Sequence, residues 1–69
     1  MNSEILKGKW NQLKGVVRSR WGKLTDDDVS RIQGDAEKFI GVLQERYGYA
    51  REQAEREMND FMNSDGRSG

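Results

Sequence analysis

The chain has 69 residues, of which 35% are charged and 33% hydrophobic, and its formal net charge at pH 7 is zero. It contains no cysteine, which excludes disulfides, thiol nucleophiles and cysteine-based metal sites, and no histidine, which removes the commonest general base and metal ligand. A domain this small buries only about 60% of its extended-chain surface, so we expect no enzyme, no cofactor, and no catalytic, cofactor-binding or metal-binding residues.

The first predicted helix covers residues 4–21. Ser3 is a suitable N-cap, and Glu4 follows it in the first turn, where the helix dipole favours negative charge. Large apolar side chains then recur every three or four residues, as on one buried face of an α-helix, at Leu6, Trp10, Leu13, Val17 and Trp21. We expect Gly22 to end this helix in the left-handed conformation that glycine tolerates.

The second predicted helix covers residues 26–33 and begins in the string TDDD at residues 25–28. Thr25 can accept a hydrogen bond from a free backbone N–H, and the three carboxylates that follow face the positive end of the helix. The same triplet could instead hold a divalent cation, but it lacks the interleaved oxygen spacing and the turn glycine of a calcium loop. We therefore interpret the triplet as a helix start, and we expect this helix to end near Gly34.

Two further helices are predicted over residues 35–47 and 51–62. The third helix repeats the apolar spacing of the first and should end at Gly48, and the fourth carries an apolar stripe opposite a charged face. Residues 63–69 contain no apolar side chain. We therefore expect a single helical domain over residues 1–62, followed by a disordered C-terminal tail over residues 63–69.

Residues 8–22 and 34–48 resemble each other. Each segment carries glycine at its first, middle and last positions, and each ends in arginine, an aromatic residue and glycine. The offset of 26 residues predicts an internally duplicated, all-α fold of four helices. The expected common core consists of matching apolar residues, which are Trp10, Leu13, Val17, Phe39 and Leu43, with Trp21 and Tyr47 in equivalent places in the two copies.

Gly15 and Gly41 are the middle glycines of the two copies, and on a helical wheel they fall roughly opposite the apolar stripes of their helices. We therefore do not expect them to let two helices cross closely in the core. Each lowers helix stability by about 1 kcal/mol relative to alanine. Either the polar face around them is a second contact surface, or the protein tolerates soft helices, which is the interpretation we favour.

Charge is divided unevenly along the chain. Residues 1–24 carry six Lys and Arg against Glu4, a net charge of +5, and residues 25–69 carry eleven Asp and Glu against six Lys and Arg, a net charge of −5. The basic residues of the first part could bind phosphate or an anionic lipid surface; they are Lys7, Lys9, Lys14, Arg18, Arg20 and Lys23. We favour pairing with the acidic remainder of the chain, because a neutral domain lacks the basic character of a nucleic-acid binder.

The strings WGKLTDDD at residues 21–28 and QERYGY at residues 44–49, with Gly34 and Gly41 between them, resemble the CsbD-like family of short, hydrophilic bacterial proteins. The resemblance covers about residues 4–62. It implies a cytoplasmic protein that is abundant under general stress and in stationary phase, with a fold of two packed helical hairpins similar to SAM-like domains. The resemblance supplies no catalytic residue or ligand to carry over, and the composition is also similar to that of hydrophilins.

The sequence thus favours a non-enzymatic, small, soluble bacterial stress-response protein of undefined biochemical activity that acts through a solvated polar surface. The alternative is a small adaptor or binding module that uses the basic first helix for a nucleic acid or an acidic protein partner. No apolar run exceeds two residues, so we expect no membrane span and no signal peptide. We expect a cytoplasmic monomer with no membrane or nucleic-acid partner.

Overall fold

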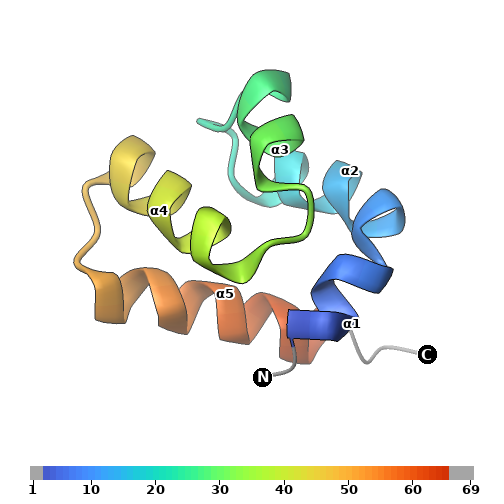
Figure 1. The fold of residues 1–69 in the computed structure, drawn as a ribbon. Helices are drawn as coiled ribbons and strands as arrows, with labels where there is room; N and C mark the ends of the chain where they lie inside the picture. Colours follow the sequence, from blue (N-terminus) through green and yellow to red (C-terminus); the bar gives the residue numbers. More distant parts are fainter. Residues whose placement is uncertain (1–2, 66–69) are drawn as a thin grey trace.

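The computed structural model describes the backbone of residues 3–65, and their side chains other than those of Ser3, Ile5, Ser64 and Asp65. Over this range the chain is helical and contains no strand, which confirms the predicted all-α class. Figure 1 shows five helices, α1 (Ser3–Gly8), α2 (Trp10–Arg20), α3 (Asp26–Ile32), α4 (Ala36–Tyr47) and α5 (Arg51–Asp65).

The short helix α3 lies between two longer ones. In Figure 1, α3 lies between α2 and α4, and α5 runs along the opposite side of α4. Helix α3 packs against both α2 and α4, α5 packs against α4, and α1 packs against α2. The chain reverses direction between α4 and α5 through the short connection at residues 48–50. The arrangement therefore leaves one seam between α2 and α3 and another between α3 and α4.

The prediction of one continuous helix over residues 4–21 is wrong, because the chain breaks at Lys9 into α1 and α2. Lys9 has φ −105° and ψ 10°, outside the helical range. A contact from a later part of the chain meets this break, since a Cβ atom added to Gly34 would lie 2.6 Å from the Cα atom of Lys7. The close approach of Gly34, together with the low helix propensity of Gly8, accounts for the break.

Glycine-associated helix ends are confirmed after α3 and α4. Gly48 is the C-cap of α4, with φ 70°, and its N–H donates to the carbonyl of Gln44. The left-handed C-cap of α3 is Gln33, with φ 47°, and Gly34 follows with φ 78°. Both ends therefore use the backbone conformation that favours glycine, although at the end of α3 a non-glycine residue shares it.

The prediction of a left-handed Gly22 is wrong. Gly22 is not among the described residues with positive φ. The C-cap of α2 is instead Trp21, with φ −116° and ψ 83°, and its N–H donates to the carbonyl of Val17. This extended exit allows Trp21 and Leu24 to enter the core, where they are 3% and 1% exposed.

The core is built around the ring of Phe39. Its ring makes edge-to-face contacts with Trp10, Trp21 and Phe61, at centroid distances of 6.1, 5.2 and 6.3 Å. The core prediction is confirmed for six residues, which are Trp10, Leu13, Val17, Trp21, Phe39 and Leu43. Tyr47 is half-buried and packs against the edge of the core, so it does not take the place that Trp21 has in the first copy.

The two copies differ in how many sides of the helix are covered. Val16 is 39% exposed, whereas Val42, at the matching position of the second copy, is 4% exposed. Helix α4 packs against both α3 and α5, so its apolar surface extends beyond the stripe that it shares with α2.

Helix α5 continues to Asp65, three residues beyond its predicted end at 62. Phe61 and Met62 are buried near the end of α5. Their packing stabilises this part of the helix, which continues for three more residues. The part of the predicted disordered tail at 63–65 is therefore helical, and the rest of that prediction, residues 66–69, lies outside the described residues.

Candidate functional surface

The first turn of α3 is fixed by a reciprocal capping box. The side-chain oxygen of Thr25 accepts a hydrogen bond from the Asp28 N–H at 3.1 Å, and the Thr25 N–H donates to Asp28 Oδ2 at 3.0 Å. Each of these contacts satisfies a backbone donor that the helix start would otherwise leave free. The predicted capping role of Thr25 is confirmed.

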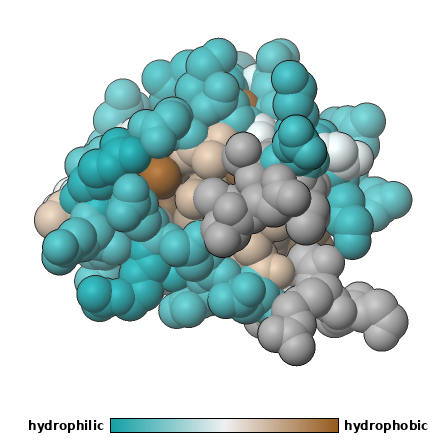
Figure 2. Space-filling model, turned by 60° about the horizontal axis from the view of Figure 1, so that its bottom comes forward, coloured by the Kyte–Doolittle hydropathy of each residue, from teal (hydrophilic) through white to brown (hydrophobic). Residues whose placement is uncertain are grey.

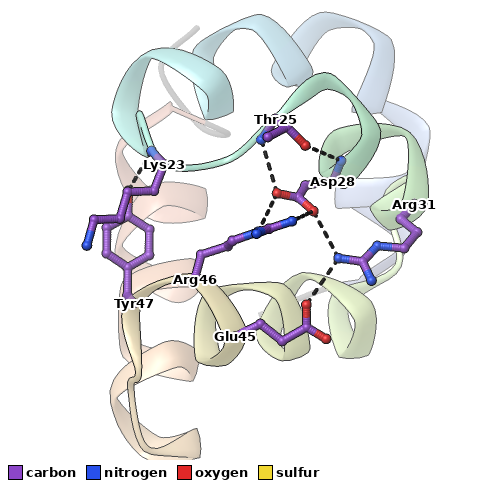
Figure 3. A network of polar contacts seen from close by, with 7 residues as sticks. All are labelled: Lys23, Thr25, Asp28, Arg31, Glu45, Arg46 and Tyr47. Atoms are coloured by element: carbon purple, nitrogen blue, oxygen red, sulfur yellow. Dashed lines mark hydrogen bonds and ion pairs between the residues drawn. The ribbon is translucent and has the colours of Figure 1, made fainter.

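The three aspartates after Thr25 have different environments, which the sequence does not reveal. Asp26 and Asp27 are exposed, whereas Asp28 is 1% exposed. Figure 3 shows that the Asp28 carboxylate points toward the end of α4, where Arg46 donates to it twice, from Nε at 2.7 Å and from an Nη atom at 2.9 Å. Arg31 adds a further hydrogen bond at 2.9 Å and also contacts Glu45 at 3.2 Å.

These contacts stabilise the ionised form of the Asp28 carboxylate. The hydrogen bonds from the Arg46 guanidinium hold the pKa of Asp28 well below its usual range, and the Thr25 backbone N–H lowers it further, although burial opposes the shift. Asp28 in turn raises the pKa of Arg46. Because the carboxylate stays charged and its oxygens accept hydrogen bonds from both helices, it ties α3 to α4.

Tyr47 joins the same part of α4 to the loop after α2. Its hydroxyl oxygen accepts a hydrogen bond from the Lys23 backbone N–H at 3.3 Å, and the Lys23 ammonium lies 5.2 Å from the centre of its ring (Figure 3). The ring of Tyr47 also stacks on that of Tyr49, with a centroid distance of 5.3 Å. Tyr47 therefore holds a loop in place, which explains why it remains half-buried.

The basic residues of the first two helices are only partly matched by acids. Arg18 forms an ion pair with Asp26, and Arg20 lies over the ring of Trp21 at 5.2 Å. With the side chains that the structure describes, the ammonium groups of Lys7 and Lys14 form no hydrogen bond or ion pair. The expectation that this basic segment is neutralised by its own chain therefore holds for Arg18 and fails for these two lysines.

Four acidic residues of the second part of the chain, Asp28, Glu37, Glu45 and Glu55, form ion pairs with arginines of the same part. Arg46 and Arg31 hold Asp28, and Arg51 donates to Glu37 at 2.8 Å and to Glu55 at 3.0 Å. These pairs lie within α3, α4 and α5. These four acidic residues are therefore engaged within their own half of the chain, whereas Asp26 pairs with Arg18 of α2.

Each middle glycine of the repeat borders a hollow beside α3. The first hollow, about 450 Å³, lies between α2 and α3 and is lined by Lys14, Gly15, Arg18, Asp26, Val29 and Ser30. The second, about 260 Å³, lies between α3 and α4 and is lined by Arg31, Lys38, Gly41, Val42 and Glu45. A Cβ atom added to Gly15 or Gly41 would meet no atom within 4 Å. The expectation that these glycines do not serve close helix crossing is confirmed.

Two further features bear on the possible chemistry. The described residues contain no group of three or more acidic side chains placed to hold a metal ion. No helix in this part of the chain combines the length and apolar character needed to cross a membrane.

Comparison with known proteins places the chain among small bacterial proteins. The CsbD-like family pattern matches residues 4–56. A UPF0337 protein of Pseudomonas aeruginosa is 56% identical over 61 residues, which cover 88% of this chain and 94% of the relative. The UPF0337 protein YjbJ of Escherichia coli K12 is 49% identical over 61 residues, which cover 88% of each chain. No solved structure matches. The family pattern and the identity to these relatives extend over most of the sequence, so this chain belongs to the CsbD-like family.

Proposed function

We propose that this chain is a non-enzymatic general stress-response protein of bacteria that acts through its solvated polar surface. The observation that carries the proposal is the distribution of ionisable side chains between the interior and the surface of the protein. Among the described residues, the one buried charged side chain is Asp28, and its oxygens accept hydrogen bonds that fix the fold. The remaining charged groups face water, where they can act on the surroundings of the protein.

The character of the surface supports this proposal. The face of the molecule in Figure 2 is largely hydrophilic, with smaller apolar areas among the hydrophilic residues. Among the described large hydrophobic side chains, Val16 is the exposed one, at 39%. A surface of this kind does not favour stable association with an apolar partner.

The stress role is tested in a bacterium that lacks the gene for this chain. We expect the deletion strain to lose viability faster than its parent in stationary phase and under osmotic stress. The intact chain should restore survival, and a Phe39→Ala variant, which lacks the centre of the core, should not. Equal survival of the deletion and parent strains under these stresses would contradict the proposal, and rescue by the Phe39→Ala variant would show that the folded surface is dispensable.

A second candidate function is a binding module for an anionic partner, and one observation favours it. Lys7 and Lys14 are exposed and have no partner among the described side chains, so positive charge remains available on α1 and α2. Binding of this kind to a nucleic acid would depend steeply on salt, because each phosphate contact releases a counterion.

The two candidates are separated by titrating labelled duplex and single-stranded DNA at low and moderate salt. Under the stress-protein proposal we expect at most weak binding that disappears near physiological salt. Micromolar affinity that survives moderate salt and is lost when Lys7, Lys14 and Arg18 are neutralised would favour the binding module. A crosslinking pull-down from stressed cells extends the test to acidic protein partners.

We also propose that the protein is a cytoplasmic monomer. We further propose that residues 1–62 form a single domain of two duplicated helical hairpins, similar to SAM-like domains. Support comes from matching positions of the two copies, since Leu13 and Phe39 are both buried, and so are Val17 and Leu43. Light scattering after gel filtration tests the monomer, and cell fractionation tests the location. Expression of residues 1–62 alone tests the domain boundary.

A further inference from the structure

The two hollows beside α3 occupy corresponding places in the repeat, but their charged groups are not held equally. In the hollow between α3 and α4, Arg31 is held by the buried Asp28 at 2.9 Å and by Glu45 at 3.2 Å. In the hollow between α2 and α3, the one described side chain that pairs with Arg18 is that of Asp26, which is 93% exposed. Exposed ion pairs of this type add little stability, so Arg18 can exchange its partner at little cost.

Three side-chain donors surround the hollow between α2 and α3. Lys14 and Arg18 are four residues apart on α2, which places them on the same side of that helix. Ser30 lies across the hollow on α3 and contributes a hydroxyl. An ammonium, a guanidinium and a hydroxyl together can donate to several oxygens of one small oxyanion, and a guanidinium matches the geometry of phosphate.

Gly15 keeps this hollow open. A side chain at position 15 would meet no protein atom within 4 Å, so packing does not require glycine there. Glycine instead makes α2 less stable than alanine would. Destabilising residues at places where packing does not need them are typical of functional surfaces. Here the missing side chain leaves free the space between Lys14 and Arg18.

We propose that the hollow between α2 and α3 is a binding site for a phosphate group, either free phosphate or a small phosphate monoester. Lys14, Arg18 and Ser30 donate to its oxygens, and Val29 forms the apolar wall. Asp26 also lines the hollow and competes for Arg18, and its exposed side chain turns to solvent when phosphate binds. The inference rests on the second candidate function and narrows it from the whole basic segment to one site.

The site is tested by following the backbone amide signals of the full chain by NMR during titration with inorganic phosphate and with glycerol phosphate, at constant ionic strength and neutral pH. We expect saturable shifts at Gly15, Arg18 and Ser30, and none at Lys38 or Gly41. Equal shifts at both hollows, or no saturable shift at either, would overturn the proposal. The two ligands distinguish free phosphate from a monoester as the preferred form.

Four variants make the test specific to this hollow. Lys14→Gln should weaken phosphate binding about tenfold, through the loss of one charge-assisted hydrogen bond, and Asp26→Asn should strengthen it by removing the competing carboxylate. Gly15→Leu should fill the hollow and abolish binding, whereas Gly41→Leu, the matched control, should retain it. Circular dichroism checks that each variant is folded. Unchanged affinity in Lys14→Gln and in folded Gly15→Leu would exclude the site.

A duplex DNA titration on the same samples separates this inference from the function on which it rests. If DNA binds through Lys7 and Lys14 while Gly15→Leu has no effect on any ligand, the binding module stands and the phosphate hollow is excluded. If phosphate saturates the hollow while DNA and the acidic proteins of the pull-down do not bind, the site stands and the macromolecular module is excluded.

Discussion

The carboxylate of Asp28 and the guanidinium of Arg46 form a two-point ion pair, at 2.7 and 2.9 Å, that joins the first turn of α3 to the last turn of α4. The two side chains differ in exposure, at 2% for Asp28 and 42% for Arg46. Only Asp28 has therefore lost most of its contact with water. Removal of Arg46 leaves a buried charge with fewer donors, whereas removal of Asp28 frees an arginine that can turn to solvent.

We expect Arg46→Gln to lower the melting temperature clearly more than Arg51→Gln. Both arginines form ion pairs from exposed positions, but the carboxylates that Arg51 contacts are exposed and can return to water. Asp28→Ala should lose about 2–4 kcal/mol, because it removes both the capping box and the charge-assisted hydrogen bonds. Thermal and urea unfolding of the three variants provide the measurement. Equal effects of the two arginine variants would show that the burial of Asp28 does not matter.

The same carboxylate predicts how stability depends on pH. The pKa of Asp28 is lower in the folded protein than in the unfolded chain, so the unfolded chain takes up the proton first as the pH falls. The stabilisation from Asp28 is therefore fully present above about pH 5 and decreases as the pH falls below the unfolded value of about 4.

Urea unfolding between pH 7 and pH 3 measures this effect. The parent should lose free energy of unfolding steadily below about pH 4, and Asp28→Asn should be less stable at pH 7 and show a shallower acid decline. Asp27→Asn, at the exposed neighbouring position, serves as the control and should follow the parent. The same acid slope in Asp28→Asn and the parent would assign the decline to other carboxylates.

The importance of the core is tested with matched positions of the repeat. Phe39→Ala should destabilise the protein by about 3–5 kcal/mol, enough to unfold much of so small a domain. Val42→Ala should cost about 1–3 kcal/mol, whereas Val16→Ala, at the matching position that is 39% exposed, should be nearly silent. Urea unfolding compares the three. Similar losses for the two valine variants would mean that the solvent-facing side of α2 is covered in solution.

Local chemistry explains which parts of the fold could be predicted from the sequence. The cap at Thr25 and the glycine after α4 depend on residues within one helical turn, and both predictions are confirmed. The break at Lys9 depends on Gly34, which approaches Lys7 from a distant part of the chain. A pattern of periodic apolar residues carries no information about such a contact, so residues 4–21 read as one helix.

The candidate surface was less predictable for the same reason. Three consecutive aspartates look alike in the sequence, and only the packing of α3 on α4 selects Asp28 for burial against Arg46. The arginine near the end of each copy also shows that the sequence does not determine these contacts. Arg46 binds a carboxylate, whereas Arg20, at the matching position, lies over aromatic rings. Sequence equivalence between the copies therefore does not transfer contacts from one to the other.

The capping interpretation of the aspartate triplet gives a separate prediction. Thr25→Ala should reduce the free energy of unfolding by about 1 kcal/mol, since it removes the side-chain acceptor for the Asp28 N–H. Millimolar calcium or magnesium should leave the melting temperature of the parent unchanged. Thermal unfolding with and without each ion is the measurement, and a chelator-treated sample is its control. A rise in melting temperature with either ion would revive the cation site at residues 26–28.

Alanine substitutions at three glycines should have opposite effects on stability, because Gly15 and Gly41 border open space whereas Gly34 is in close contact with the backbone of α1. Gly15→Ala and Gly41→Ala should each stabilise the protein by up to about 1 kcal/mol, since the added methyl group meets no atom within 4 Å and alanine is the better helix former. Gly34→Ala should do the opposite. Its φ is 78°, and the new Cβ atom would lie 2.6 Å from the backbone of Lys7, so the variant combines backbone strain with a clash that cannot be relieved by rotating a side chain.

Urea unfolding of the three alanine variants tests this contrast directly. The loss in Gly34→Ala should exceed about 1 kcal/mol, and the amide signals of α1 and α2 should shift because the contact lies at their junction. If Gly15→Ala and Gly41→Ala are destabilising instead, the space beside these glycines must be occupied in solution. If Gly34→Ala is neutral, the junction can relax, and the close contact would no longer explain why the first helix breaks at Lys9.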